Sequence, residues 1–256
     1  MARKKPKRPK GDRAIEGRNP VREALLAKAD LDQIWMARGL VENEKIKEIF
    51  RLAVRQKVLV RRVPRQLLER TSLTHRPQGV IAFGKTLPDL SLAQILDQAE
   101  EKKNASFLVL TESLDEQNLG AILRTAEAVG IQAVILPKKA KGVTPVVTRV
   151  AMGAVEHLPV IKTNLFITLK RFKDQGIKII GATSQARKSL YQVDLTGPAA
   201  LAIGGEDKGM TTTIRKNCDL LVSIPMWGRV SSLNMSVAWA VLAYEKQRQE
   251  LVKNKS

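Results

Sequence analysis

Three stretches of the sequence combine polar side chains with glycines or apolar residues in a way that could build a ligand site. In the first, Asn118 is suited to cap a helix that runs to Val129, and Arg124 lies beside the apolar face of that helix. A solvated arginine would be ordinary there, but Arg124 could also reach beyond the carboxyl edge of a sheet toward a ligand. In the second, residues 203–210, Glu206 lies among glycines that follow an expected strand and would let a ligand approach the backbone closely.

The third stretch, residues 224–236, mixes a proline, a glycine and three serines with apolar residues, which predicts a loop that leaves a strand and bends sharply. Such a loop offers backbone amides and carbonyls to a bound molecule. It runs into a helix for which Asn234 or Ser236 is the expected N-cap. The apolar positions that mark this helix are Val237, Ala240, Val241 and Tyr244. Taken alone, the stretch also fits an ordinary loop before a core helix.

The net charge favours a polyanionic partner. The chain of 256 residues has 44 Lys and Arg against 25 Asp and Glu, which gives a formal charge of +19. Nucleic acid is the commonest polyanion, so we expect a nucleic-acid partner.

The few sulfur and imidazole side chains limit the chemistry. Cys218 is the only cysteine, and His75 and His157 are the only histidines. We therefore expect no internal disulfide, a reducing compartment and no metal. His157 is expected to be structural, because no carboxylate partner is evident at a useful spacing. The sequence has no apolar run of membrane-spanning length and no secretion signal near Met1, so we expect a soluble cytoplasmic protein without a membrane partner.

Composition and periodicity divide the chain into four parts. Residues 1–13 hold seven basic side chains against one acidic side chain, which predicts a disordered arm that gains affinity for phosphates by releasing counterions. Residues 14–85 predict a small α/β domain, residues 86–104 a linker, and residues 105–256 a second α/β domain.

The first domain alternates helices and strands, which favours parallel pairing of its strands. Asn19 is expected to cap its first helix, which ends at Leu26. The other expected elements are strands 31–37, 58–63 and 80–83 and helices 44–56 and 64–70. Its arginines, which suit contacts to a phosphate backbone, are Arg51, Arg55, Arg61, Arg62, Arg65 and Arg70.

Residues 79–86 match the phosphate-binding pattern G-x-x-x-x-G-K-[ST], which would make the protein a P-loop ATPase. The pattern works only as a loop between a strand and a helix, because the loop amides must point at phosphates. Here residues 80–83 are themselves predicted as a strand, and Pro88 blocks a helix directly after Lys85. We therefore interpret the match as accidental.

The second domain follows a helix of residues 92–102 that Ser91 can cap. Its expected strands are 107–110, 134–136, 177–182 and 199–203, and its expected helices are 118–129, 144–153 and 165–174. In open α/β sheets of this kind, sites usually lie at the carboxyl edge.

Together, the three stretches resemble the signature motifs of the SpoU, or TrmH-like, family of RNA ribose 2′-O-methyltransferases in the SPOUT superfamily. The matching segments are residues 118–125, 204–209 and 224–234 with Ala238, in the family's order and spacing. The resemblance covers about residues 106–250, and residues 16–25 resemble the start of the L30e-like RNA-binding domain of the ribosomal-RNA members. Met152 departs from the small residue expected before Gly153.

The resemblance implies an α/β fold in which a parallel sheet ends in a C-terminal trefoil knot, beside a small N-terminal L30e-like domain. It implies S-adenosylmethionine as cofactor, bound in a bent pose by Gly204, Gly205, Ile224, Met226 and Leu233. It also implies a homodimer that packs through helices including the last one, with a catalytic site completed across the dimer.

For catalysis, the resemblance points to Arg124, with Asn118, Glu206, Ser232 and Asn234 ordering the site. A ribose 2′-hydroxyl is a weak nucleophile at neutral pH, so it needs proton removal and close placement against the methyl group. Because an arginine side chain keeps its proton, we expect Arg124 to hold a phosphate and polarise the hydroxyl. Whether Arg124 also takes the proton stays open.

The expected substrate is a guanosine of 23S ribosomal RNA, because the basic arm and the first domain suit a large folded RNA. A guanosine of transfer RNA is the alternative substrate. A catalytically silent RNA-binding protein is a further alternative, although such a protein would not need Arg124, Glu206 and Asn234 together.

Overall fold

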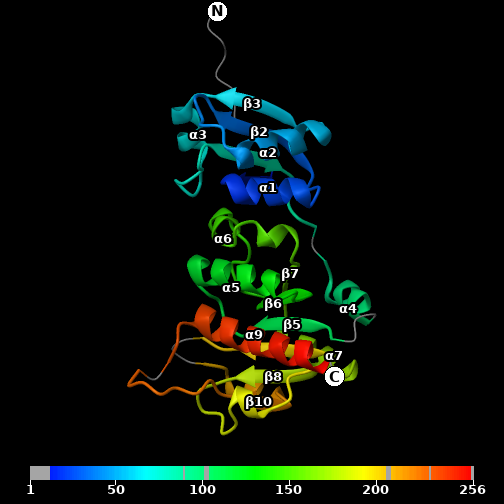
Figure 1. The fold of residues 1–256 in the computed structure, drawn as a ribbon. Coiled ribbons are helices and arrows are strands. Elements are labelled where there is room, and N and C mark those ends of the chain that lie inside the picture. Colours follow the sequence, from blue (N-terminus) through cyan, green and yellow to red (C-terminus); the bar gives the residue numbers. More distant parts are fainter. Residues whose placement is uncertain (1–11, 89, 101–103, 206–208, 231, 255–256) are drawn as a thin grey trace, which may run out of the picture. The chain divides into compact units, whose positions relative to one another are not determined.

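The structure is a computed structural model that describes residues 12–88, 90–100, 104–205, 209–230 and 232–254. The chain forms two compact units (Figure 1). Unit 1 contains Met1–Pro88 and Thr144–His157, and unit 2 contains Asp89–Val143 and Leu158–Ser256. The expected basic arm lies outside the described residues except for its last two positions, and Arg13 already belongs to the first strand. The expected domain boundaries stay predictions.

Unit 1 is built on a four-stranded sheet of order β1-β4-β2-β3. Its strands are β1 (Arg13–Glu16), β2 (Leu31–Ala37), β3 (Leu59–Val63) and β4 (Val80–Gly84). β2 and β3 pair in parallel, but β4 runs antiparallel to both β1 and β2, so the prediction of parallel pairing is wrong for β4. Alternation of helices and strands does not fix the direction of β4, because the loop before it decides from which end it enters the sheet.

A buried carboxylate holds that loop in place. Glu16, at the end of β1, is fully buried and accepts hydrogen bonds from Ser72 Oγ (2.6 Å), the Leu73 amide (2.6 Å) and Thr74 Oγ1 (2.6 Å). These bonds offset the free energy lost when a carboxylate leaves water. The loop is therefore fixed beside the end of β1. Because β4 begins where β1 ends, the two strands run antiparallel.

The helices of unit 1 are α1 (Arg18–Leu26), α2 (Glu44–Arg55), α3 (Arg65–Thr71) and α6 (Pro145–Val150). Gly17, at φ 104°, leaves β1 and forms the N-cap of α1, so the prediction that Asn19 is the cap is wrong. The Asn19 side chain instead accepts a hydrogen bond from Lys45. His157 does have a carboxylate partner, since its Nε2 lies 3.1 Å from Glu23 Oε2 on α1, at a separation in sequence that spacing alone does not reveal.

The nucleotide-binding match falls on β4. Val80–Gly84 is a strand paired with β2, so its amides belong to a sheet and not to a phosphate loop. Lys85 Nζ pairs with Asp30 Oδ2 at 2.6 Å, and a Cβ on Gly84 would lie 2.3 Å from the Asp30 carbonyl oxygen. Packing inside the chain accounts for this glycine, in agreement with an accidental match.

Unit 2 is built on a six-stranded parallel sheet of order β10-β8-β9-β5-β6-β7, which confirms the predicted fold class. The strands are β5 (Ser106–Leu110), β6 (Ala133–Pro137), β7 (Val160–Thr163), β8 (Lys178–Ala182), β9 (Ala199–Ile203) and β10 (Leu220–Val222). The central strands β5 and β9 are buried along their whole length, as in parallel sheets covered on both faces. The sequence does not predict the short edge strands β7 and β10.

Helices cover both faces of this sheet. They are α4 (Leu92–Glu100), α5 (Glu116–Ala128), α7 (Leu165–Asp174), α8 (Thr212–Asn217) and α9 (Met235–Lys253). α4, α7 and α8 share one apolar core with the sheet, whereas α5 and α9 pack against each other on the other face (Figure 1). Ser91 Oγ accepts from the Gln94 amide at 3.3 Å, as a cap of α4 should.

The last helix has its predicted cap, and its apolar positions divide between a buried and an exposed side. Asn234 Oδ1 accepts a hydrogen bond from the Ser236 amide at 2.9 Å. The buried apolar positions of α9 are Met235, Trp239, Leu242 and Ala243. Of the apolar positions that mark the helix in the sequence, Val237 and Tyr244 are 48% and 57% exposed, whereas Ala240 and Val241 are half-buried.

Two further expectations concern the chain as a whole. Strand order and register do not describe threading, so the trefoil knot implied by the resemblance stays a prediction. Among the helices in the described part of the chain, none combines the length and apolar character needed to cross a membrane.

Candidate functional site

The carboxyl ends of three neighbouring strands bring the predicted site segments together. β5 and β9 are adjacent, with Leu110 opposite Ile203, and the Thr111 amide donates to the Ile203 carbonyl at 3.1 Å. β8 lies on the other side of β9, with Ala182 opposite Ile203. Because parallel strands end at the same edge of a sheet, the segments that follow them emerge side by side. The first and second stretches follow β5 and β9, so strand pairing makes them neighbours.

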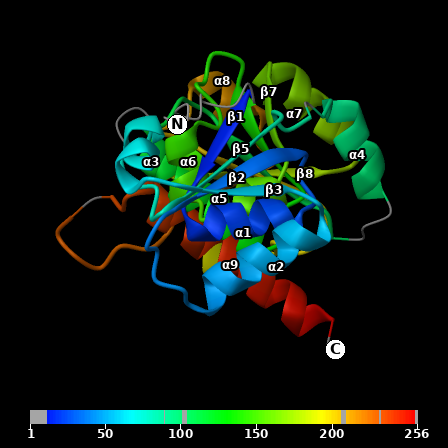
Figure 2. The ribbon, with the colours of Figure 1, turned by 90° about the horizontal axis from the view of Figure 1, so that it is seen from above.

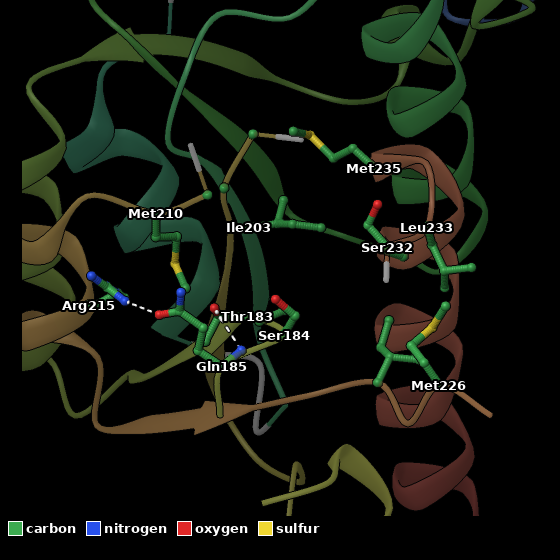
Figure 3. A pocket seen from close by; sticks show the side chains of 16 residues that line it. Thr183, Ser184, Gln185, Ile203, Met210, Arg215, Met226, Ser232, Leu233 and Met235 are labelled. Atoms are coloured by element: carbon green, nitrogen blue, oxygen red, sulfur yellow. Dashed lines mark hydrogen bonds between the residues drawn. The ribbon is translucent and has the colours of Figure 1, made fainter. Parts of the chain in front are cut away.

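A pocket of about 290 Å³ lies at this edge (Figure 3). Six predicted site residues line it: Gly204, Gly205, Ile224, Met226, Ser232 and Leu233. Figure 3 shows Met226 and Leu233 on one side of the pocket and Met210 and Gln185 on the other, with Ile203 between them. The pocket thus joins the second and third stretches, and its volume is near the lower end of the usual range for small-molecule sites, roughly 300–1,000 Å³.

The polar side of the pocket is not predicted from the sequence. Thr183, Ser184 and Gln185 follow β8, and Arg215 comes from α8. Arg215 Nη1 donates to Gln185 Oε1 at 2.6 Å, and the Gln185 amide donates to Thr183 Oγ1 at 3.4 Å (Figure 3). The run of polar residues directly after a predicted strand could have indicated the β8 segment. Nothing comparable marks Arg215, because the sequence does not predict α8.

Two glycines of the second stretch, Gly204 and Gly205, serve the packing of the chain itself. A Cβ on Gly204 would lie 2.2 Å from the Met210 amide nitrogen, and a Cβ on Gly205 would lie 1.3 Å from Glu112 Oε1. The amide of Gly209 donates to the carbonyl of Gly205 at 3.0 Å. Glu112, which follows β5, therefore lies against the second stretch. The predicted site residue Glu206 lies outside the described residues.

A hydrogen bond joins the first and third stretches. Asn234 Nδ2 donates to Asn118 Oδ1 at 2.9 Å, and Asn118 Nδ2 donates to Asp115 Oδ2 at 2.7 Å. These two predicted site residues are 116 positions apart in the sequence. The contact fixes the start of α5 to the start of α9.

The cap of α5 differs from the prediction. Asp115, not Asn118, is the N-cap, and its Oδ1 accepts from the amides of Gln117 (2.8 Å) and Asn118 (2.9 Å). The hydrogen bond from the Asn118 amide is the largest of the effects that hold the pKa of Asp115 below its usual value. Asp115 is therefore ionised at neutral pH, where its charge favours the amino end of a helix. Asn118 can turn its side chain toward the third stretch because Asp115 takes the capping position.

Arg124 lies on the outer side of α5. Its side chain is exposed, whereas Ile122 and Leu123 beside it are fully buried. The described residues that line the pocket do not include Arg124, Asn118 or Asn234. Arg124 is thus available to a molecule that approaches the site from outside the chain.

The pocket combines apolar and polar surfaces. Ile203, Met210 and Leu233 supply apolar side chains, and the Gln185–Arg215 pair supplies amide and guanidinium groups. The arrangement can hold a small ligand that has an apolar ring and several hydrogen-bonding groups. Within the described ranges there is no group of three or more His, Cys, Asp or Glu side chains suited to a metal ion.

Two family models match the chain. The model described as "SpoU rRNA Methylase family" matches residues 105–244. The model described as "RNA 2′-O ribose methyltransferase substrate binding" matches residues 14–90. The first match spans the pocket and all three stretches, and the second falls on the amino-terminal part of unit 1.

Similar proteins are found in several bacteria. The 23S rRNA (guanosine-2′-O-)-methyltransferase RlmB of Pseudomonas putida is 40% identical, over 86% of this chain and 90% of that protein. RlmB of Shewanella oneidensis is 38% identical, over 89% of this chain and 94% of that protein. YacO of Bacillus subtilis, named for the TrmH family of tRNA/rRNA methyltransferases, is 39% identical, over 91% of this chain and 94% of that protein.

Solved structures share the fold. The crystal structure of an RNA 2′-O ribose methyltransferase aligns with 93% of this chain and with 88% of its own chain, at a TM-score of 0.78 and 28% identity. The SpoU methyltransferase AviRb from Streptomyces viridochromogenes, solved in complex with the cofactor AdoMet, covers 93% of this chain and 90% of its own, with a TM-score of 0.78. Because its sequence is only 24% identical, the similarity to AviRb shows the fold alone.

Proposed function

Because the chain belongs to the SpoU rRNA methylase family, we propose that it transfers a methyl group from S-adenosylmethionine to the ribose 2′-hydroxyl of a guanosine in 23S ribosomal RNA. The observation that carries the proposal is the likeness to two RlmB proteins at 40% and 38% identity. That likeness extends over 90% and 94% of their lengths, so it includes the substrate-binding part as well as the methylase part. An enzyme of ribosomal RNA works where ribosomes assemble, and we therefore propose that it acts in the cytoplasm.

The pocket at the carboxyl edge suits S-adenosylmethionine. Ile203, Met210 and Leu233 offer apolar surfaces to an adenine ring, and the backbone at Gly204 and Ile224 offers hydrogen-bonding groups to its edge. When bound, this cofactor supplies an electrophilic methyl group on a positively charged sulfur. The apolar and hydrogen-bonding groups that line the pocket fit such a molecule, and its binding there needs no metal ion.

The residues of the chain itself would place and polarise the RNA hydroxyl. Arg124 is exposed on α5, and its planar guanidinium can hold a phosphate and donate to the 2′-hydroxyl at the same time. Asn118, on the same helix, is bonded to Asn234 and so ties α5 to α9, and Ser232 lines the pocket. We propose that Glu206 completes the site as an acceptor. Holding the hydroxyl close to the methyl group turns a slow bimolecular reaction into an intramolecular one.

We further propose that two copies of the chain assemble through α9. Val237, Tyr244 and Leu251 are 48%, 57% and 62% exposed, and they recur at the spacing that keeps apolar side chains on one side of a helix. The opposite side of α9 is already buried in unit 2. A row of apolar side chains exposed to water is best explained by a second copy of the chain that covers it. Sedimentation should give a dimer for the wild type and a monomer for a Val237→Asp/Tyr244→Asp variant; a monomeric wild type would remove this proposal.

The function is tested in two steps on the full-length protein. Calorimetry should show binding of S-adenosylhomocysteine, the product form of the cofactor, and a Gly204→Val variant should lose it because the added side chain collides with the Met210 backbone. Unmodified 23S ribosomal RNA and bulk transfer RNA are then incubated with the protein and S-adenosylmethionine, and 2′-O-methylation is mapped by mass spectrometry. We expect one modified guanosine in 23S ribosomal RNA.

The other outcomes each point to a different function. Methylation of transfer RNA alone would favour the alternative substrate, to which the TrmH family name of YacO also refers. RNA binding without cofactor binding or methylation would identify a catalytically silent RNA-binding protein.

A further inference from the structure

One tryptophan of the chain is almost completely exposed. Trp227 is 88% exposed, whereas Trp35 and Trp239 are fully buried. An indole is one of the largest apolar groups in proteins, and leaving it in water forgoes the free energy that its burial would release. An exposed indole of this kind indicates a partner that covers it.

The position of Trp227 ties that partner to the candidate site. Trp227 lies on the loop between β10 and α9, the orange segment that projects from unit 2 in Figure 1 and Figure 2. Its neighbour Met226 lines the pocket and is itself 38% exposed. On its other side, a Cβ on Gly228 would meet nothing within 4 Å. The indole therefore stands in water, on the residue that follows one lining the pocket.

The chemistry of the loop favours a nucleobase as the partner. Arg229 is exposed two positions after Trp227, and the chain carries a formal charge of +19. Proteins hold unpaired RNA bases by stacking them on aromatic rings and on guanidinium planes, while arginines contact the flanking phosphates. A loop that pairs an exposed indole with an exposed guanidinium has the groups needed for both contacts.

Resting on the proposed function, we propose that Trp227 is a positioning residue that stacks on an unpaired base of the RNA substrate beside the cofactor pocket. Stacking would hold that nucleotide out of its helix while a ribose 2′-hydroxyl lies at the pocket. Trp227 takes no part in proton or methyl transfer, so its effect is on RNA binding and on the placement of the nucleotide.

The test compares Trp227→Ala with Trp227→Phe in the full-length protein. The matched control is Val230→Ala, which removes an apolar side chain that is 70% exposed on the same loop but cannot stack. For each variant we measure the affinity for an unmodified 23S ribosomal RNA transcript, kcat/KM for its methylation, the affinity for S-adenosylhomocysteine and the sedimentation coefficient. We also follow quenching of tryptophan fluorescence by the RNA.

We expect Trp227→Ala to weaken RNA binding about ten-fold or more and to lower kcat/KM at least as much. Trp227→Phe should recover most of both, and Val230→Ala should resemble the wild type. Cofactor affinity and sedimentation should not change in any variant. RNA should quench the fluorescence of the wild type but not of Trp227→Phe, because the two remaining tryptophans are buried.

Two results would overturn the inference. One is a Trp227→Ala variant with wild-type RNA affinity and kcat/KM. The other is a Trp227→Ala variant that becomes monomeric, which would make a second copy of the chain the partner of the indole. A wild-type protein that binds the RNA with quenching but does not methylate it would contradict the proposed function and leave the stacking contact established.

Discussion

At the scale of single residues, the contact between Asn118 and Asn234 joins two distant motifs into one site. An asparagine side chain carries an acceptor and two donors, and both residues use this capacity: Asn118 accepts from Asn234 and donates to Asp115, while Asn234 Oδ1 accepts from the Ser236 amide. A carboxylate of the same size could accept but could not donate, so it would not satisfy this set of bonds. Both positions need a side chain that can donate and accept at once, because each lies at the start of a helix and also bonds the other. Asparagine meets this need.

The coupling between these two asparagines can be measured. Asn118→Ala and Asn234→Ala should each weaken S-adenosylhomocysteine binding, because the loop of residues 224–234 is then no longer tied to α5. In the double variant, the loss of binding free energy should be smaller than the sum of the two single losses by about 0.5–1.5 kcal/mol, the range for one hydrogen bond. Gln117→Ala, on the same turn of α5, serves as the control and should bind normally. Strictly additive effects would show that the bond does not contribute.

Arg124 is expected to act on the RNA and not on the cofactor. Arg124→Ala should lower kcat/KM for RNA methylation by about a hundred-fold or more and leave S-adenosylhomocysteine affinity within about two-fold, in the range seen when a positioned catalytic group is removed. Arg124→Lys should remain badly impaired, because a point charge does not reproduce a planar fork of donors. Glu127→Ala, also exposed on α5, is the control. Near-normal turnover by the alanine variant would remove Arg124 from the mechanism.

At the scale of elements, a buried ion pair fastens α9 to the segment before β9. Lys246 Nζ donates to the carbonyls of Leu195 (2.9 Å) and Gly197 (2.8 Å) and to Glu250 Oε1 (2.8 Å). Glu250 Oε1 also accepts from the Gly197 amide at 2.7 Å. All three protons of the buried ammonium group have partners, so the pair is tolerated inside the protein and fixes the position of the helix.

Breaking this pair should destabilise unit 2. Lys246→Ala should lower the free energy of unfolding by about 3–5 kcal/mol, because it leaves the Glu250 carboxylate buried without its cation. Lys253→Ala is the matched control, since Lys253 lies on the same helix but is exposed and donates to the Thr196 hydroxyl, and its loss should change stability by less than about 0.5 kcal/mol. Urea unfolding of each variant gives the comparison. Equal stabilities for the two variants would refute the role assigned to Lys246.

At the scale of the whole molecule, unit 1 carries many exposed arginines and unit 2 contains the pocket. The exposed arginines of unit 1 lie on α2, β3 and α3 and in the loops beside them. Deleting residues 1–85 would be a poor test of their role, because Glu156 and His157 of unit 1 would then be without their partners Arg13 and Glu23. Substitutions on the surface keep these ion pairs and change only the charge.

The triple variant Arg51→Ala/Arg55→Ala/Arg61→Ala should bind 23S ribosomal RNA more weakly and with a smaller dependence on salt. The slope of log affinity against log salt should fall by roughly 0.7–0.9 for each RNA phosphate that no longer has an arginine partner. S-adenosylhomocysteine binding should stay at the wild-type value, because the pocket lies in unit 2. Filter binding over a range of salt concentrations measures the slope. An unchanged slope would show that these arginines do not bind the RNA backbone.

Local patterns were enough for much of the architecture of unit 2. Strands β5 and β9 and helix α7 are predictable because buried parallel strands are continuous apolar runs, and because Asn164 and Gly176 bracket the helix. The residues that line the pocket are predictable only in part. Gly204, Ile224 and Leu233 belong to a motif, whereas Gln185 and Arg215 belong to none and enter the pocket from β8 and α8.

The sequence by itself determined the charge, the order of most elements and the family, because composition, apolar periodicity and motif spacing are properties of the chain read in one dimension. Only the tertiary structure decided which residues meet. The direction of β4 depends on hydrogen bonds from Ser72 and Thr74 to the distant Glu16, and the buried face of α9 depends on where α5 lies. The bond between Asn118 and Asn234 likewise exists because β5 and β9 pair and bring separate helix starts together. Long-range pairing sets all three, and no local pattern encodes it.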